Sequence, residues 1–73
     1  MTDSALGERG LVGREAQVVL PLAADNPGKI RCNVDRKTVE MRARAVESGE
    51  SFAIDDQVLI IDMEEGIALV ARI

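Results

Sequence analysis

The stretch that decides the fold runs from Gly28 to Val46 and reads GKIRCNVDRKTVEMRARAV. Apolar and polar residues alternate in two runs, 29–34 and 38–45, and a period of two is typical of strands with one buried and one exposed face. The short polar segment 35–37 between the runs predicts that they form an antiparallel hairpin. The residues expected on its exposed face are Lys29, Arg31, Asn33, Thr38, Glu40, Arg42 and Arg44.

The position of the turn decides which charges meet across this hairpin. A two-residue turn at 36–37 would place Arg31 opposite Arg42, and such like-charged pairs destabilise a sheet. A shifted register would instead place Arg31 opposite Glu40, with a different turn. The turn lacks the Asn-Gly signature that would decide between them. We adopt the first register, in which an anionic partner would settle on four basic residues: Lys29, Arg31, Arg42 and Arg44.

Three further strands are expected, at 16–22, 57–63 and 67–73. Pro21 cannot donate a backbone hydrogen bond, so the end of the first strand should lie at a sheet edge or a bulge. Four consecutive apolar residues in the second predict burial on both faces or a bulge. The turn that enters the domain should be anchored by Leu11, and the connection 47–56 should close one end of the core with Phe52 and Ile54.

Five short strands, with no secure helix, predict an all-β fold. A sheet of this size must close or leave long edges exposed. We therefore predict a small five-stranded OB-fold-like Greek-key barrel over residues 10–73, preceded by a flexible lead-in at 1–9; an SH3-like barrel is the competing architecture. The predicted core consists of Val18, Leu20, Ile30, Cys32, Val34, Val39, Met41, Ala43, Val58 and Ile60.

Basic charge is concentrated on the hairpin. Residues 28–46 carry six basic and two acidic side chains, a net charge of +4, whereas the rest of the chain carries three basic and eleven acidic ones, a net charge of −8. Basic residues on this part of an OB-fold favour an anionic partner: an acidic protein segment, an anionic membrane surface or an oligonucleotide. Nucleic acid is disfavoured, because the face has no aromatic residue on which bases could stack.

Catalysis and metal binding find little support in the sequence. The chain has no histidine and no tyrosine, and no nucleophile stands beside a base. Cys32 lies between apolar neighbours and is expected to be a packed thiol. The acidic pairs at 55–56 and 64–65 lack the spacing of a calcium loop. We therefore predict a protein that is not an enzyme, with no catalytic residue, metal site or cofactor.

Several turn and strand segments together match the pattern of a known family. They are 10–16 (GLVGREA), 18–21 (VVLP), 27–31 (PGKIR), 42–45 (RARA), 57–60 (QVLI) and 68–70 (ALV). These segments resemble the NfeD-like C-terminal domain, including that of YqiJ-type membrane proteins, and the resemblance covers residues 10–72. Two positions depart from the family pattern, because Ala16 and Asp56 stand where glycines are usual, which affects local turns.

This resemblance implies an OB-fold domain at the cytoplasmic end of a membrane protein that works with stomatin- or flotillin-type scaffold proteins. No apolar run in the chain approaches the roughly 18 residues of a membrane span, so the resemblance implies a domain separated from its membrane segment. We expect a non-enzymatic interaction or assembly module that binds its partner through Lys29, Arg31, Arg42 and Arg44. The alternative is an OB-type nucleic-acid-binding domain that uses the same basic face.

Overall fold

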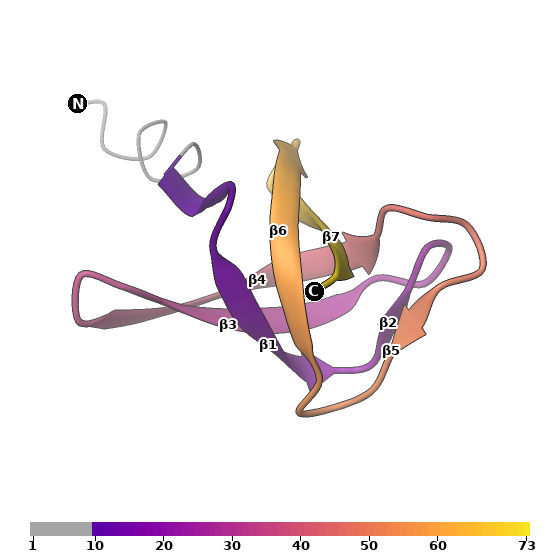
Figure 1. The fold of residues 1–73 in the computed structure, drawn as a ribbon, viewed down its shortest axis with the longest axis horizontal. Helices are drawn as coiled ribbons and strands as arrows, with labels where there is room; N and C mark the ends of the chain where they lie inside the picture. Colours follow the sequence, from indigo (N-terminus) through magenta and orange to yellow (C-terminus); the bar gives the residue numbers. More distant parts are fainter. Residues whose placement is uncertain (1–9) are drawn as a thin grey trace.

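The computed structural model describes residues 10–73, and the predicted lead-in at 1–9 lies outside the described residues. The described part is built almost entirely of strands (Figure 1). No helix within it is long and apolar enough to cross a membrane. The strands are β1 (Glu15–Leu20), β2 (Leu22–Ala23), β3 (Gly28–Val34), β4 (Lys37–Ala45), β5 (Ser51–Phe52), β6 (Gln57–Glu64) and β7 (Ile67–Arg72).

Five of the strands close into a barrel in the order β1-β3-β4-β7-β6, with β6 returning to pair with β1. All neighbours are antiparallel except β4 and β7, which run parallel. These are the five strands that the alternation predicts, and their closure confirms the small OB-like all-β fold. A closed sheet leaves no long edge within the barrel.

Two short strands that the sequence did not predict lie beside the barrel. Pro21 ends β1, and the chain resumes as β2, which pairs with β5. This pairing buries Leu22 and Phe52, so Phe52 closes one end of the core as expected. The same expectation for Ile54 is wrong, because Ile54 lies in the turn that follows β5 and is 54% exposed.

Most of the residues predicted for the core are buried, but some are not. Leu20 was expected in the core but is 50% exposed, because the β1–β3 register shifts between Val18 and Leu20 and turns the side chain outward. A second register shift, in β6 between Ile60 and Asp62, confirms the bulge predicted for the apolar run 58–61. The buried members of the predicted core are Val18, Ile30, Cys32, Ala43, Val58 and Ile60, and Val34, Val39 and Met41 are half-buried.

The structure corrects the register of the central hairpin. Its two-residue turn is Asp35-Arg36, both with positive φ (52° and 67°), and not the predicted 36–37. Positive φ at both central residues matches a type I′ turn, whose twist suits a hairpin. Arg31 therefore pairs with Glu40 instead of Arg42. An opposite-charge pair thus replaces the repulsive Arg31–Arg42 pair, which favours this register, while Lys29 faces Arg42 in it.

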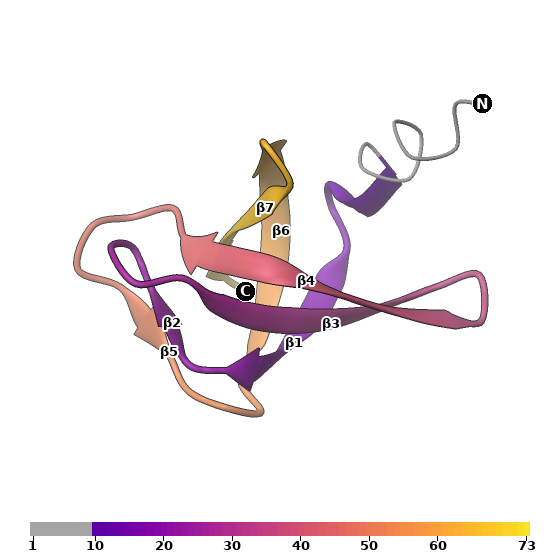
Figure 2. The same cartoon turned by 180° about the vertical axis from the view of Figure 1, so that it is seen from behind.

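The tip of this hairpin extends well beyond the barrel, as Figures 1 and 2 show from opposite sides. The last β3 residue paired with β1 is Arg31, and the first β4 residue paired with β7 is Ala43. Residues 32–42, here called the hairpin arm, thus form a two-stranded ribbon. Two strands alone bury little, which explains why Val34, Val39 and Met41 on the inner side of the arm stay half-buried. Cys32, where the arm meets β1, is buried.

Candidate functional site

The four predicted partner-binding residues share one surface. Their strand neighbours Ile30 and Ala43 point into the core and are fully buried, so alternation places the basic side chains on the outside of the barrel. Lys29 and Arg42 are direct cross-strand partners. We call the set Lys29, Arg31, Arg42 and Arg44 the basic face.

Glu40 lies in the middle of the basic face and neutralises part of it. Nε and Nη2 of Arg31 donate to Oε2 of Glu40 at 3.2 and 3.0 Å, and Nζ of Lys29 lies 3.9 Å from Oε1 of the same carboxylate. All three side chains are more than 40% exposed, so each contact contributes at most about 1 kcal/mol to stability. These pairs orient the cations without removing them from solvent.

The remaining two cations differ in their surroundings. Nη2 of Arg44 donates to Oε1 of Glu64, at the end of β6, at 3.3 Å. Arg42 is exposed and forms no ion pair with any residue in 10–73. With two carboxylates against four cations, the surface keeps a net charge of +2, and Arg42 is its free guanidinium. A guanidinium in this state can receive a carboxylate in a bidentate arrangement.

Sequence reasoning found the four cations and placed Glu40 on the same exposed face, but it did not adopt the Arg31–Glu40 pairing and it missed Glu64. The shifted register would have predicted the contact of Glu40, because it pairs Glu40 with Arg31 across the hairpin. Glu64 is twenty positions from Arg44 in the chain, and only the closure of the barrel brings the two together. Whether a partner binds the basic face stays a prediction.

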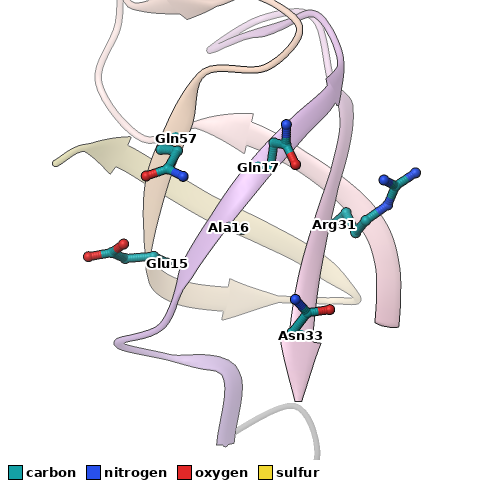
Figure 3. A pocket seen from close by; sticks show the side chains of 6 residues that line it. All are labelled: Glu15, Ala16, Gln17, Arg31, Asn33 and Gln57. Carbon is teal, nitrogen blue, oxygen red and sulfur yellow. The ribbon is translucent and has the colours of Figure 1, made fainter. Parts of the chain in front are cut away.

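A shallow polar cavity of about 270 Å³ borders the basic face. Its side chains come from β1, β3 and β6, as Figure 3 shows. Nε2 of Gln17 donates to Oδ1 of Asp55 at 3.0 Å, which ties one wall of the cavity to the loop before β6. The lining offers amides, one guanidinium and one carboxylate, which are hydrogen-bonding groups and not a nucleophile–base pair. Its residues are Glu15, Ala16, Gln17, Arg31, Asn33 and Gln57.

Cys32 is a packed thiol, as predicted. Its side chain is 2% exposed, and Sγ donates to the carbonyl oxygen of Glu15 at 3.5 Å. Burial raises the pKa of the Cys32 thiol, and the positive charge of Arg14 offsets only part of that effect. The thiol is therefore held in its unreactive protonated form.

The acidic residues before β6 organise a turn. Oδ2 of Asp56 accepts the backbone N–H of Ala53 at 2.9 Å, and Asp55 accepts Gln17 as described above. Within residues 10–73, no three carboxylate or thiol side chains gather as metal ligands would. The structure thus gives these carboxylates a local role in shaping the loop.

Comparisons with solved structures place the fold among domains of membrane proteins. The chain is 29% identical to the soluble domain of a membrane protein implicated in regulation of membrane protease activity from Corynebacterium glutamicum, with a TM-score of 0.75 over 89% of this chain and 95% of that one. It is 18% identical to the soluble domain of the NfeD protein YuaF from Bacillus subtilis, with a TM-score of 0.71 over 94% and 89% of the two chains.

A third similar structure is the C-terminal domain of a stomatin operon partner protein from Pyrococcus horikoshii, 24% identical, with a TM-score of 0.69 over 92% of this chain and 94% of that one. No family model and no curated protein matches the chain. The structural matches confirm the predicted resemblance: residues 10–73 have the fold of the NfeD-like C-terminal domain.

Proposed function

Starting from this NfeD-like fold, we propose that the domain is a non-enzymatic interaction module that works with a stomatin- or flotillin-type scaffold protein at the cytoplasmic face of a membrane. Two similar structures support the proposal by their context. One belongs to a stomatin operon partner protein, and another to a membrane protein implicated in regulating membrane protease activity. The observation that carries the proposal is that the matches span almost the whole length of both chains, so the correspondence is between whole domains.

The surface we propose for the partner is the basic face, Lys29, Arg31, Arg42 and Arg44. Within residues 10–73, basic side chains of an otherwise acidic chain gather here on the outside of the barrel. Arg42 is free of ion pairs within the described residues, and the contacts of the other three are exposed. Such cations accelerate and orient the approach of an acidic partner more than they add to raw affinity.

A nucleic-acid-binding role is a weaker reading of the same surface. The only aromatic residue in the chain is Phe52, and it is 6% exposed within the core. Binders of single strands depend on aromatic side chains on which bases stack. The basic face has none, so its contacts to an oligonucleotide would be limited to phosphates.

The proposal is tested by a binding titration against the cytoplasmic part of a stomatin- or flotillin-type protein. We expect the parent to bind in a salt-sensitive way and the double variant Arg31→Glu/Arg42→Glu to bind more weakly while remaining folded. The control is Arg14→Glu/Arg72→Glu, which changes the net charge equally but lies outside the hairpin. Parallel titrations use anionic vesicles and a labelled single-stranded oligonucleotide at low salt.

Equal weakening by both double variants would show that only net charge matters, and would remove the basic face from the proposal. Salt-sensitive micromolar binding of the oligonucleotide, with none to the scaffold protein, would favour the nucleic-acid reading. Binding to the vesicles alone would assign the basic face to the membrane surface.

A further inference from the structure

The outer edge of β4 within the hairpin arm has no neighbouring strand among residues 10–73. β7 pairs with β4 only over Ala43–Ala45, and β3 occupies the opposite side. Six residues, Lys37 to Arg42, therefore present a strand edge to solvent. An edge of this kind is a template for a further strand, and folded proteins either cover it or protect it with charge.

Backbone direction along β4 can be assigned from one hydrogen bond. The N–H of Val46, directly after β4, donates to the carbonyl oxygen of Val70 in β7 at 3.0 Å. Because successive residues of a strand direct their backbone groups to opposite sides, Thr38, Glu40 and Arg42 direct theirs to the same side as Val46. β7 ends its pairing at Ala43, where the register has the N–H of Ala68 directed to the carbonyl of Arg42. Thr38 and Glu40 therefore offer unpaired donors and acceptors, and Arg42 offers its N–H.

The side chains along this edge define the chemistry of an added strand. On the inner side of the arm, Val39 and Met41 are half-buried and can receive apolar side chains. On the outer side, the carboxylate of Glu40 is engaged by Arg31, while Arg42 has no ion pair within the described part of the chain. The edge thus pairs best with a strand that is apolar on the inner side and carries an acidic residue opposite Arg42 on the outer side.

A second copy of the chain fits this edge poorly. Antiparallel self-pairing centred on Glu40 would oppose two Glu40 carboxylates. Centring it on Met41 would require the edge of Ala43, which β7 occupies. Centring it on Val39 would set Arg42 of each copy against the arginine at the tip of the other arm. Each register carries a like-charge or steric conflict, so the occupant is a different chain.

We propose that the free edge of β4, Thr38 to Arg42, binds an extended acidic and apolar segment of a protein partner by strand addition. This inference rests on the proposed function and specifies how its partner would dock. Main-chain hydrogen bonds then supply affinity, and the alternation of side chains supplies specificity. The basic face would contribute Arg42 to the same contact.

The test uses as its probe a labelled synthetic peptide in which valine alternates with threonine, with a single glutamate at the position intended to face Arg42. Thr38→Pro removes an edge-directed N–H without changing any charge, and proline is tolerated where the N–H of an edge strand faces solvent. Thr38→Val is the matched control, since it loses the same hydroxyl, which donates to Oδ1 of Asn33 at 3.2 Å, but keeps the N–H. We expect the proline variant to bind about tenfold more weakly than the valine variant.

Amide hydrogen exchange on the parent gives a second readout that needs no variant. Peptide binding should slow exchange at Glu40 and Arg42, whose N–H groups face the edge, and leave Val39 and Met41 unchanged, since these are already directed to β3. Failure of the parent to bind the peptide, equal affinity of the proline and valine variants, or protection elsewhere in the barrel would each overturn the inference.

The two proposals fail in different ways. If Arg31→Glu/Arg42→Glu weakens binding of the scaffold protein but Thr38→Pro does not, strand addition is wrong and the interaction module stands. If the peptide protects Glu40 and Arg42 but the scaffold protein does not bind at all, the free edge stands and the partner named in the proposed function is wrong.

Discussion

At the scale of single residues, Ile30 lies at the centre of β3 and is fully buried. Replacing it with alanine should lower the free energy of unfolding by about 2–5 kcal/mol, because large-to-small core substitutions lose buried surface and leave a cavity. Urea denaturation measures the loss. The control is Ile54→Ala, which removes the same atoms from a side chain that is 54% exposed and should change stability little. Equal losses would contradict the assigned core.

Cys32 allows a test of burial that does not perturb the fold. Its thiol should react slowly with a thiol reagent in the native state and rapidly in denaturant, because it is buried and protonated. Folding raises the pKa of the Cys32 thiol above its value in the unfolded chain. The contribution of the protonated thiol to stability is therefore fully present below the unfolded-state pKa and is lost as the pH rises through the folded-state pKa. Stability should therefore fall more steeply at alkaline pH in the parent than in Cys32→Val. Fast labelling of the native protein would show that Cys32 is exposed, and the side of β3 assigned to the core would then be wrong.

The residue scale also shows where sequence patterns are sufficient. Strict alternation identified Ile30, Cys32 and Ala43 as buried, because a period of two leaves only two possible faces. It failed at Leu20, since a bulge changes the face without changing the alternation. The expectation for Ile54 rested on residue type alone, and it failed because Ile54 lies in a turn.

At the scale of elements, β3 begins at Gly28, which lies against the backbone where β1 ends. A Cβ atom at this position would lie 2.2 Å from the carbonyl oxygen of Pro21 and 2.4 Å from that of Leu20. Gly28→Ala should therefore cost at least about 1–3 kcal/mol, because both contacts are with backbone that cannot rotate away. Thermal unfolding measures the cost. Gly10→Ala, with nothing within 4 Å of the new Cβ, serves as control, and a parental Tm in both variants would refute this close approach.

The turn of the hairpin arm offers a stabilising substitution. Arg36 has φ 67°, a left-handed conformation that costs a residue with a side chain about 1–2 kcal/mol. Arg36→Gly should raise the free energy of unfolding by about 0.5–1 kcal/mol, the remainder being offset by the greater freedom of glycine in the unfolded chain. Lys37→Gly, inside β4, should be destabilising instead. If the second were the stabilising one, the turn would lie at 36–37 after all.

The length of a strand decided whether the sequence could predict it. The five barrel strands have at least six residues each, enough for a period to be visible, whereas β2 and β5 have two. A two-residue strand has no pattern, and it exists here because Leu22 and Phe52 need burial at one end of the barrel. The hairpin register could not be fixed either, because Asp35-Arg36 lacks the usual glycine or asparagine of its turn type.

At the scale of the whole molecule, closure of the barrel gathers charges that the sequence keeps apart. Arg44 meets Glu64, and Arg72 meets Glu50 at 3.4 Å, both pairs from distant segments. The same closure leaves the hairpin arm projecting from the barrel with its basic outer face and its free edge. The basic composition of 28–46 was visible in the sequence, but the projection of the arm depends on where β1 and β7 stop pairing.

The central claim is that this arm and the adjoining basic face form the docking surface for a protein partner. The most direct measurement is a map of backbone amide chemical shifts as the cytoplasmic part of a stomatin- or flotillin-type protein is added. We expect the perturbed amides to cluster between Lys29 and Arg44. Perturbations confined to the β6–β7 turn or to the loops around Asp25 and Gly49, with the hairpin unchanged, would contradict it.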